Sequence, residues 1–77
     1  MPTFLRDGPY RVFVYSSDGG EPPHVHVQRD NAVAKYWLEP LHLARNAGFS
    51  ARELREFQRV LDDRGEECMR KWNEFFR

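Results

Sequence analysis

Two histidines that stand two residues apart, His24 and His26, are the residues of this chain best suited to chemistry. They lie in the run Glu-Pro-Pro-His-Val-His-Val, residues 21–27. On a strand, side chains two residues apart point to the same face, so both imidazoles would project together. Such a pair can bind a metal ion, act as a general base or form a polar recognition surface.

A metal site needs more ligands than two imidazoles. Structural zinc sites use four protein ligands, and catalytic zinc sites use three. Glu21 would be a third ligand for His24 and His26, and Cys68 and His42 are the other residues of suitable type. Because the sequence does not place them, we expect no metal and no other cofactor, and a metal-binding domain stays as an alternative.

Catalysis is another alternative, with His24, His26 and Lys35 as the candidate catalytic residues. An imidazole can take a proton from a hydroxyl group, and a lysine can stabilise a phosphate. Trp37 and Tyr15 would offer rings on which bases stack. This combination is typical of a small ribonuclease-type toxin.

The same face can instead recognise a protein. The candidate binding residues are then His24, His26, Lys35, Trp37 and Glu21. Aromatic side chains are enriched at protein interfaces and among their energetic hot spots. Recognition needs no special geometry, so we favour it over catalysis and expect a non-enzymatic protein.

The elements that must position these residues predict an α+β fold. Residues 10–15, 24–29 and 33–38 are rich in β-branched and aromatic side chains, which favours three antiparallel strands. Residues 41–45 would add a fourth strand or form an irregular crossing. A two-residue turn at Asp30-Asn31 pairs His26 with Lys35 and His24 with Trp37. The core face of the hairpin is then its more apolar one: Val25, Val27, Ala34, Tyr36 and Leu38.

A C-terminal helix is expected over about 50–75, packed on one face of the sheet, in a single domain spanning 1–77. Ser50 followed by Glu53 is typical of a helix start. A straight helix of this length would overhang six-residue strands. It would therefore kink near Gly65, or its overhang would pack on a second copy in a homodimer.

Charge and cysteine content narrow the class of protein. Twelve basic and twelve acidic residues cancel, which argues against non-specific nucleic-acid binding and leaves specific binding open. The acidic residues of the helix alternate with basic ones, as on an ordinary charged helix face: Asp62, Asp63, Glu66 and Glu67. Cys68 is the single cysteine, and no apolar run approaches the ~20 residues of a membrane span. We expect a cytoplasmic protein that does not enter membranes.

Several segments, in this order and spacing, resemble the motif blocks of a bacterial family: 21–27, 34–40, 43–50, 53–56 and 72–76. That family is domain-of-unknown-function family 4160. Its members are frequently encoded beside a small protein of another uncharacterised family, 2442, as in toxin–antitoxin or regulator pairs. The resemblance implies a co-encoded protein partner rather than a reaction. We therefore expect a small interaction module of a two-gene pair.

Overall fold

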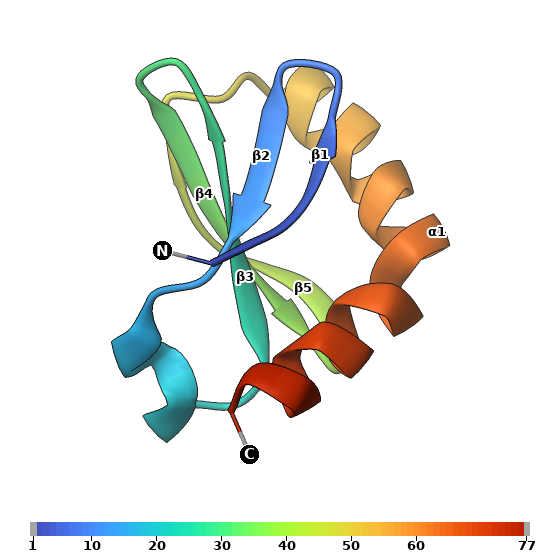
Figure 1. Ribbon diagram of the computed structural model, residues 1–77. Coiled ribbons are helices and arrows are strands. Elements are labelled where there is room, and N and C mark those ends of the chain that lie inside the picture. The colour runs from blue at the N-terminus through green and yellow to red at the C-terminus, as the bar shows by residue number, and fades with distance from the viewer. Residues whose placement is uncertain (1, 77) are drawn as a thin grey trace.

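The computed structural model describes residues 2–76 and has an α+β fold (Figure 1). One antiparallel sheet holds its five strands in chain order: β1 (Thr3–Asp7), β2 (Tyr10–Phe13), β3 (His24–Arg29), β4 (Ala32–Leu38) and β5 (Leu41–Ala47). A short 3-10 helix, η1 (Ser16–Gly20), joins β2 to β3. The long helix α1 (Ala51–Phe75) runs across one face of the sheet.

The fold class is confirmed, but the sheet has five strands instead of three or four. β1 lacks apolar alternation because its two buried residues, Phe4 and Leu5, are neighbours at an irregularity in the pairing with β2. Gly8, with φ of +57°, is in the turn of this first hairpin. β5 is an edge strand of mostly exposed residues, so its sequence carries little of the pattern of a buried strand.

The central hairpin has the expected register. Asp30 has φ of +52° in the two-residue turn, and β3 pairs with β4 so that His26 faces Lys35 and His24 faces Trp37. The residues expected on the core face are all buried: Val25, Val27, Ala34, Tyr36 and Leu38. The hairpin therefore places both histidines on the face opposite α1.

The helix starts where the sequence indicates, and of the two alternatives left open for its length it has the kink, next to Gly65. Ser50 Oγ accepts a hydrogen bond from the backbone N–H of Glu53 at 3.1 Å. Arg64 departs from helical geometry, with φ of −116° and ψ of 17°. A straight helix of 25 residues would be about 37 Å long, which exceeds the 34 Å longest dimension of the domain. The kink lets α1 follow the curved core.

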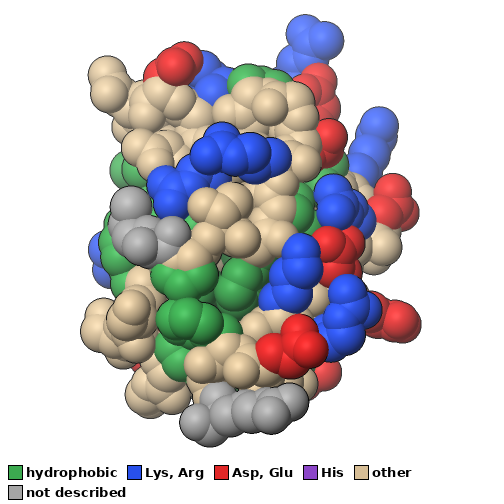
Figure 2. Space-filling model, viewed as in Figure 1, with side chains coloured by type: hydrophobic (Ala, Val, Ile, Leu, Met, Phe, Trp, Pro, Cys, Tyr) green, Lys and Arg blue, Asp and Glu red, His purple; other side chains and the backbone are tan. Residues whose placement is uncertain are grey.

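The outer side of α1 carries interleaved acidic and basic side chains, as Figure 2 shows. Glu67 illustrates the pairing, since it accepts hydrogen bonds from Arg64 at 3.0 Å and from Lys71 at 2.9 Å. The acidic residues of this helix therefore form an ordinary charged surface. Within residues 2–76, no helix has both the length and the apolar character needed to cross a bilayer.

An ion pair joins the central hairpin to the first turn of α1, and it predicts a pH dependence. Arg29 Nε donates to Glu53 Oε2 at 2.6 Å. This hydrogen bond lowers the pKa of Glu53 below its ordinary value of 4.5. The unfolded chain therefore takes up a proton at a pH where folded Glu53 is still ionised. The stability that Glu53 contributes is present above about pH 4.5 and is lost as the pH falls through the folded pKa.

We expect Glu53→Gln to lower the free energy of unfolding at pH 7. The difference in unfolding free energy between the variant and wild type, which we call the gap, should close in acid. Urea denaturation at a series of pH values measures this gap. Glu66→Gln is the matched control, because Glu66 is exposed on the same helix and its side chain makes no hydrogen bond or ion pair with the described residues. A gap between Glu53→Gln and wild type that stays constant with pH would contradict the assignment.

Candidate functional site

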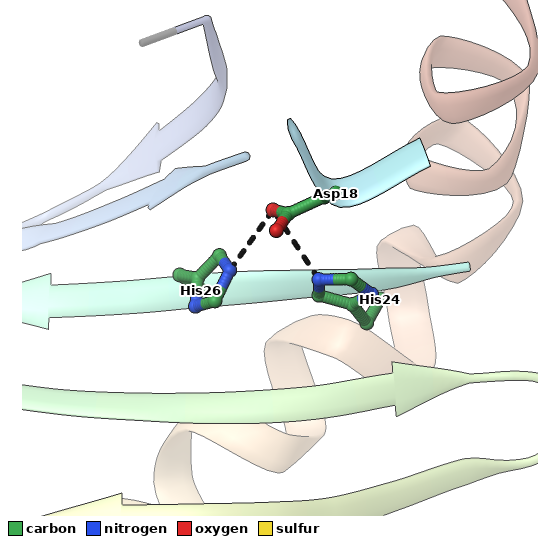
Figure 3. Close-up of side chains that lie close together, drawn as sticks. All are labelled: Asp18, His24 and His26. Carbon is green, nitrogen blue, oxygen red and sulfur yellow. Dashed lines mark hydrogen bonds and ion pairs between the residues drawn. The ribbon is translucent and has the colours of Figure 1, made fainter. Parts of the chain in front are cut away.

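Three side chains of complementary chemistry meet where η1 folds over the start of β3 (Figure 3). Asp18 Oδ2 lies 3.0 Å from His26 Nε2 and 3.2 Å from His24 Nε2. One potential ligand atom from each of the three residues lies within 4.8 Å of the other two. The pair of histidines expected from the sequence is therefore joined by a carboxylate.

Local backbone geometry holds Asp18 over the strand. The N–H of Tyr15 donates to Asp18 Oδ2 at 2.8 Å, and the N–H of Glu21 donates to the carbonyl of Asp18 at 3.1 Å. The end of α1 supports the same turn, because a Cβ on Gly19 would lie 2.7 Å from Cδ1 of Phe76. Figure 1 shows η1 beside this end of α1.

His24 is completely buried, which is a correction to its expected place on an exposed recognition face. Its ring packs edge-on against Trp37, with centroids 5.5 Å apart at 79°, and lies 5.1 Å from the ring of Trp72. Its exposed fraction is 0%, with Asp18 of η1 and Trp72 of α1 against its ring. No histidine is visible on the face drawn in Figure 2. His24 can position its neighbours, but it cannot touch a substrate or a partner directly.

The two ring nitrogens of His24 have different surroundings. Nδ1 lies 2.9 Å from the carbonyl oxygen of Pro22, to which it donates a hydrogen bond. Nε2 is buried and has no hydrogen-bond partner among the described residues, although Asp18 Oδ2 is 3.2 Å away. A buried polar atom without a partner is costly and uncommon in folded proteins.

The charge states of Asp18 and His26 follow from their surroundings. Burial lowers the pKa of His26 below 6.5, and the hydrogen bond to Asp18 offsets only part of that effect. Burial alone would raise the pKa of Asp18, but the hydrogen bond from the Tyr15 N–H and the nearby His24 bring the pKa below its ordinary 3.8. At neutral pH the pair is therefore a carboxylate that accepts a hydrogen bond from a neutral imidazole.

A surface hollow of about 280 Å³ lies beside His26. Its polar lining comes from Tyr15, His26, Lys35 and Arg45. Lys35 Nζ donates to Glu21 Oε1 at 2.7 Å and lies 4.4 Å from the centroid of the Trp37 ring. We use the name recognition face for the hollow together with the following five residues: Tyr15, His26, Lys35, Trp37 and Arg45.

Sequence reasoning missed two residues of this region. Asp18 lies in the segment Ser-Ser-Asp-Gly-Gly, whose glycines indicate a turn but not its direction. Arg45 pairs with Lys35 across β4 and β5. Extending the hairpin register by one strand would pair Lys35 with Ala44 instead, because the β4–β5 register shifts between Lys35 and Tyr36. Asp18 has no periodic signal either.

The other candidate ligands lie elsewhere. Glu21 Oε1 is 3.7 Å from Nδ1 of His24, on the opposite side of the ring from Asp18, and it pairs with Lys35. His42 is exposed on β5. Cys68 lies in the core, where burial raises its pKa to about 11, so it is a packing residue and not a reactive thiolate.

A family model described as "Domain of unknown function (DUF4160)" matches residues 10–73, which include every residue of the site and of the recognition face. No curated protein and no solved structure matches the chain.

The packing of η1 on α1 predicts different effects at two neighbouring glycines. A methyl group at Gly19 would press on the ring of Phe76, whereas one at Gly20 would meet nothing within 4 Å. We expect Gly19→Ala to lower the free energy of unfolding by about 1–3 kcal/mol, and Gly20→Ala to change it by less than about 0.5 kcal/mol. Chemical denaturation of both variants measures this difference. Equal effects would show that η1 is not held by α1.

Proposed function

We propose that this chain, which belongs to the family described as a domain of unknown function (DUF4160), is a protein-interaction module whose partner is the product of a neighbouring gene. The observation that carries the proposal is the hollow of about 280 Å³ on the open side of the sheet. It combines cationic and aromatic side chains at a place that α1 does not cover. Such a surface suits recognition better than a flat charged face does.

The charges of the hollow indicate the chemistry of the partner. Arg45 is exposed and its side chain makes no hydrogen bond or ion pair with residues 2–76, so its guanidinium is available. Lys35 adds a second cation from the neighbouring strand. Arginine forms paired hydrogen bonds with carboxylates. The partner would therefore place an aspartate or glutamate side chain in the hollow.

The aromatic side chains supply the apolar part of the contact. Tyr15 is 41% exposed at the edge of the hollow, and Trp37 is partly exposed further along the same face. Large rings packed around a central ion pair exclude water from it and strengthen it. A partner encoded beside this chain agrees with the gene pairing that the family resemblance implies.

The test is co-expression with the neighbouring gene product, followed by purification through a tag on that product. We expect the two proteins to purify together, and Arg45→Glu to weaken binding about tenfold or more, because it sets like charges against each other. Arg59→Glu is the matched control, since Arg59 is exposed on α1. Recovery of the tagged neighbour without this chain, or equal losses in both variants, would overturn the proposal.

A ribonuclease is the second candidate, and one contact favours it. Asp18 holds the Nε2–H of neutral His26, which leaves the lone pair of Nδ1 free to take a proton from a ribose hydroxyl. Lys35 and Arg45 line the same hollow and would bind the phosphate. His24 would then act only by positioning His26, because it is fully buried.

Expression of the chain in bacteria tests this second candidate. A ribonuclease would arrest growth and cleave RNA in vitro, and His26→Ala would abolish both while circular dichroism shows that the variant is folded. His42→Ala serves as control, because it removes an exposed imidazole outside the site. Normal growth with intact RNA would rule the candidate out and would leave the interaction proposal untouched.

A further inference from the structure

We propose that Asp18, His24 and His26 form a binding site for one divalent transition-metal ion of the zinc type. The proposal goes beyond partner binding, because it concerns the side chains that hold η1 against β3 and needs no second protein. Counting the two histidines alone gave too few ligands for a metal. Asp18 supplies a third, and three protein ligands are the number found in catalytic zinc sites.

The lone pair of His24 is the first argument. A carbonyl oxygen only accepts hydrogen bonds, so the contact with Pro22 places a ring proton of His24 on Nδ1. In that tautomer Nε2 presents a lone pair, and the acceptor Asp18 Oδ2 lies 3.2 Å from it. Two acceptors that face each other in a buried place repel one another. A cation between them would turn this repulsion into two bonds.

The spacing of the three atoms is the second argument. Zinc binds imidazole nitrogen and carboxylate oxygen at about 2.0–2.2 Å with tetrahedral geometry, so two ligand atoms of one ion lie about 3.3–3.6 Å apart. The separations from Asp18 Oδ2, 3.0 Å to His26 and 3.2 Å to His24, are a few tenths of an ångström shorter than this, and ligand atoms of the two histidines lie within 4.8 Å of each other. Small movements of η1 would therefore suffice to admit the ion.

The outer contacts of the ligands fit the same role. A histidine that binds a metal usually donates its second ring N–H to a carbonyl or carboxylate, which fixes the ring. His24 makes this bond to Pro22, and the backbone N–H of Tyr15 orients Asp18. His26 would bind through Nε2 once its ring proton moves to Nδ1. Both outer contacts are thus already in place.

The ligand types select the ion. Two imidazoles and one carboxylate suit zinc, iron, nickel or cobalt, whereas magnesium and calcium prefer sites made of oxygen atoms. Asp18 and His26 keep 14% and 15% of their side-chain surface exposed, so an ion can enter. Three protein ligands leave at least one coordination position for water or another small ligand.

Titration of the untagged, chelator-treated protein with Zn²⁺ tests the proposal. Calorimetry should give one ion per chain, and excess Zn²⁺ should raise the unfolding temperature, because the ion binds the folded state. Asp18→Asn and His26→Gln should each weaken binding by at least about tenfold. Asn keeps the acceptor for the Tyr15 N–H, so Asp18→Asn preserves the turn, and thermal unfolding without metal verifies that both variants fold.

Two control variants remove groups of the same chemistry outside the ligand set. Glu21→Gln removes the carboxylate on the other side of the His24 ring, and His42→Gln removes the exposed imidazole of β5. Both should bind Zn²⁺ like wild type. The absence of saturable binding, a stoichiometry other than one, equal losses in His42→Gln, or unchanged binding in Asp18→Asn and His26→Gln would each overturn the proposal.

Discussion

Among residues 2–76, a single α-helix covers the five-stranded sheet, and the arrangement of the site depends on how it does so. α1 buries an apolar stripe on one face of the sheet: Phe57, Leu61, Cys68 and Trp72. Because the helix bends at Arg64, its last turns pass around the end of the sheet and bring Trp72 against His24. Within residues 2–76 no α-helix lies on the other face, where η1 covers the start of β3 and Phe13 is buried beneath the rings of Tyr15 and His26. One end of the open face is thus closed and polar, and the rest stays accessible.

The sequence predicts the parts of this fold that depend on local pattern. Apolar alternation and the Asp30-Asn31 turn determine the register of the hairpin, and with it the neighbours of both histidines. The burial of His24 was not predictable in this way, because it depends on Trp72, nearly fifty residues later in the chain. Asp18 was missed for a related reason. Its turn contains two glycines, and glycine permits many backbone directions, so only tertiary contacts decide where the carboxylate points.

His26 contacts both the Asp18 turn at the end of the sheet and the hollow on its open face, so it connects these two sites. Its Nε2 contacts Asp18, while its ring forms part of the wall of the hollow beside Lys35. Whatever fixes Asp18 therefore also fixes one wall of the hollow. A side chain that is already held before a ligand arrives loses less conformational freedom on binding. The rings of Phe13 and Tyr15, 5.5 and 4.8 Å from that of His26, restrict it further.

The contact between Gly19 and Phe76 sets an order of events during synthesis. A ribosome makes a chain from its amino end, so the histidines of β3 emerge well before the last turn of α1. Until Phe76 has left the ribosome, η1 lacks the ring on which it packs, and Asp18 is not held over the strand by α1. The hairpin can form early from its own turn and alternation, whereas the carboxylate–imidazole cluster is complete only when the helix has closed over it. The packing of η1 on α1 is therefore completed after the scaffold that carries the three side chains.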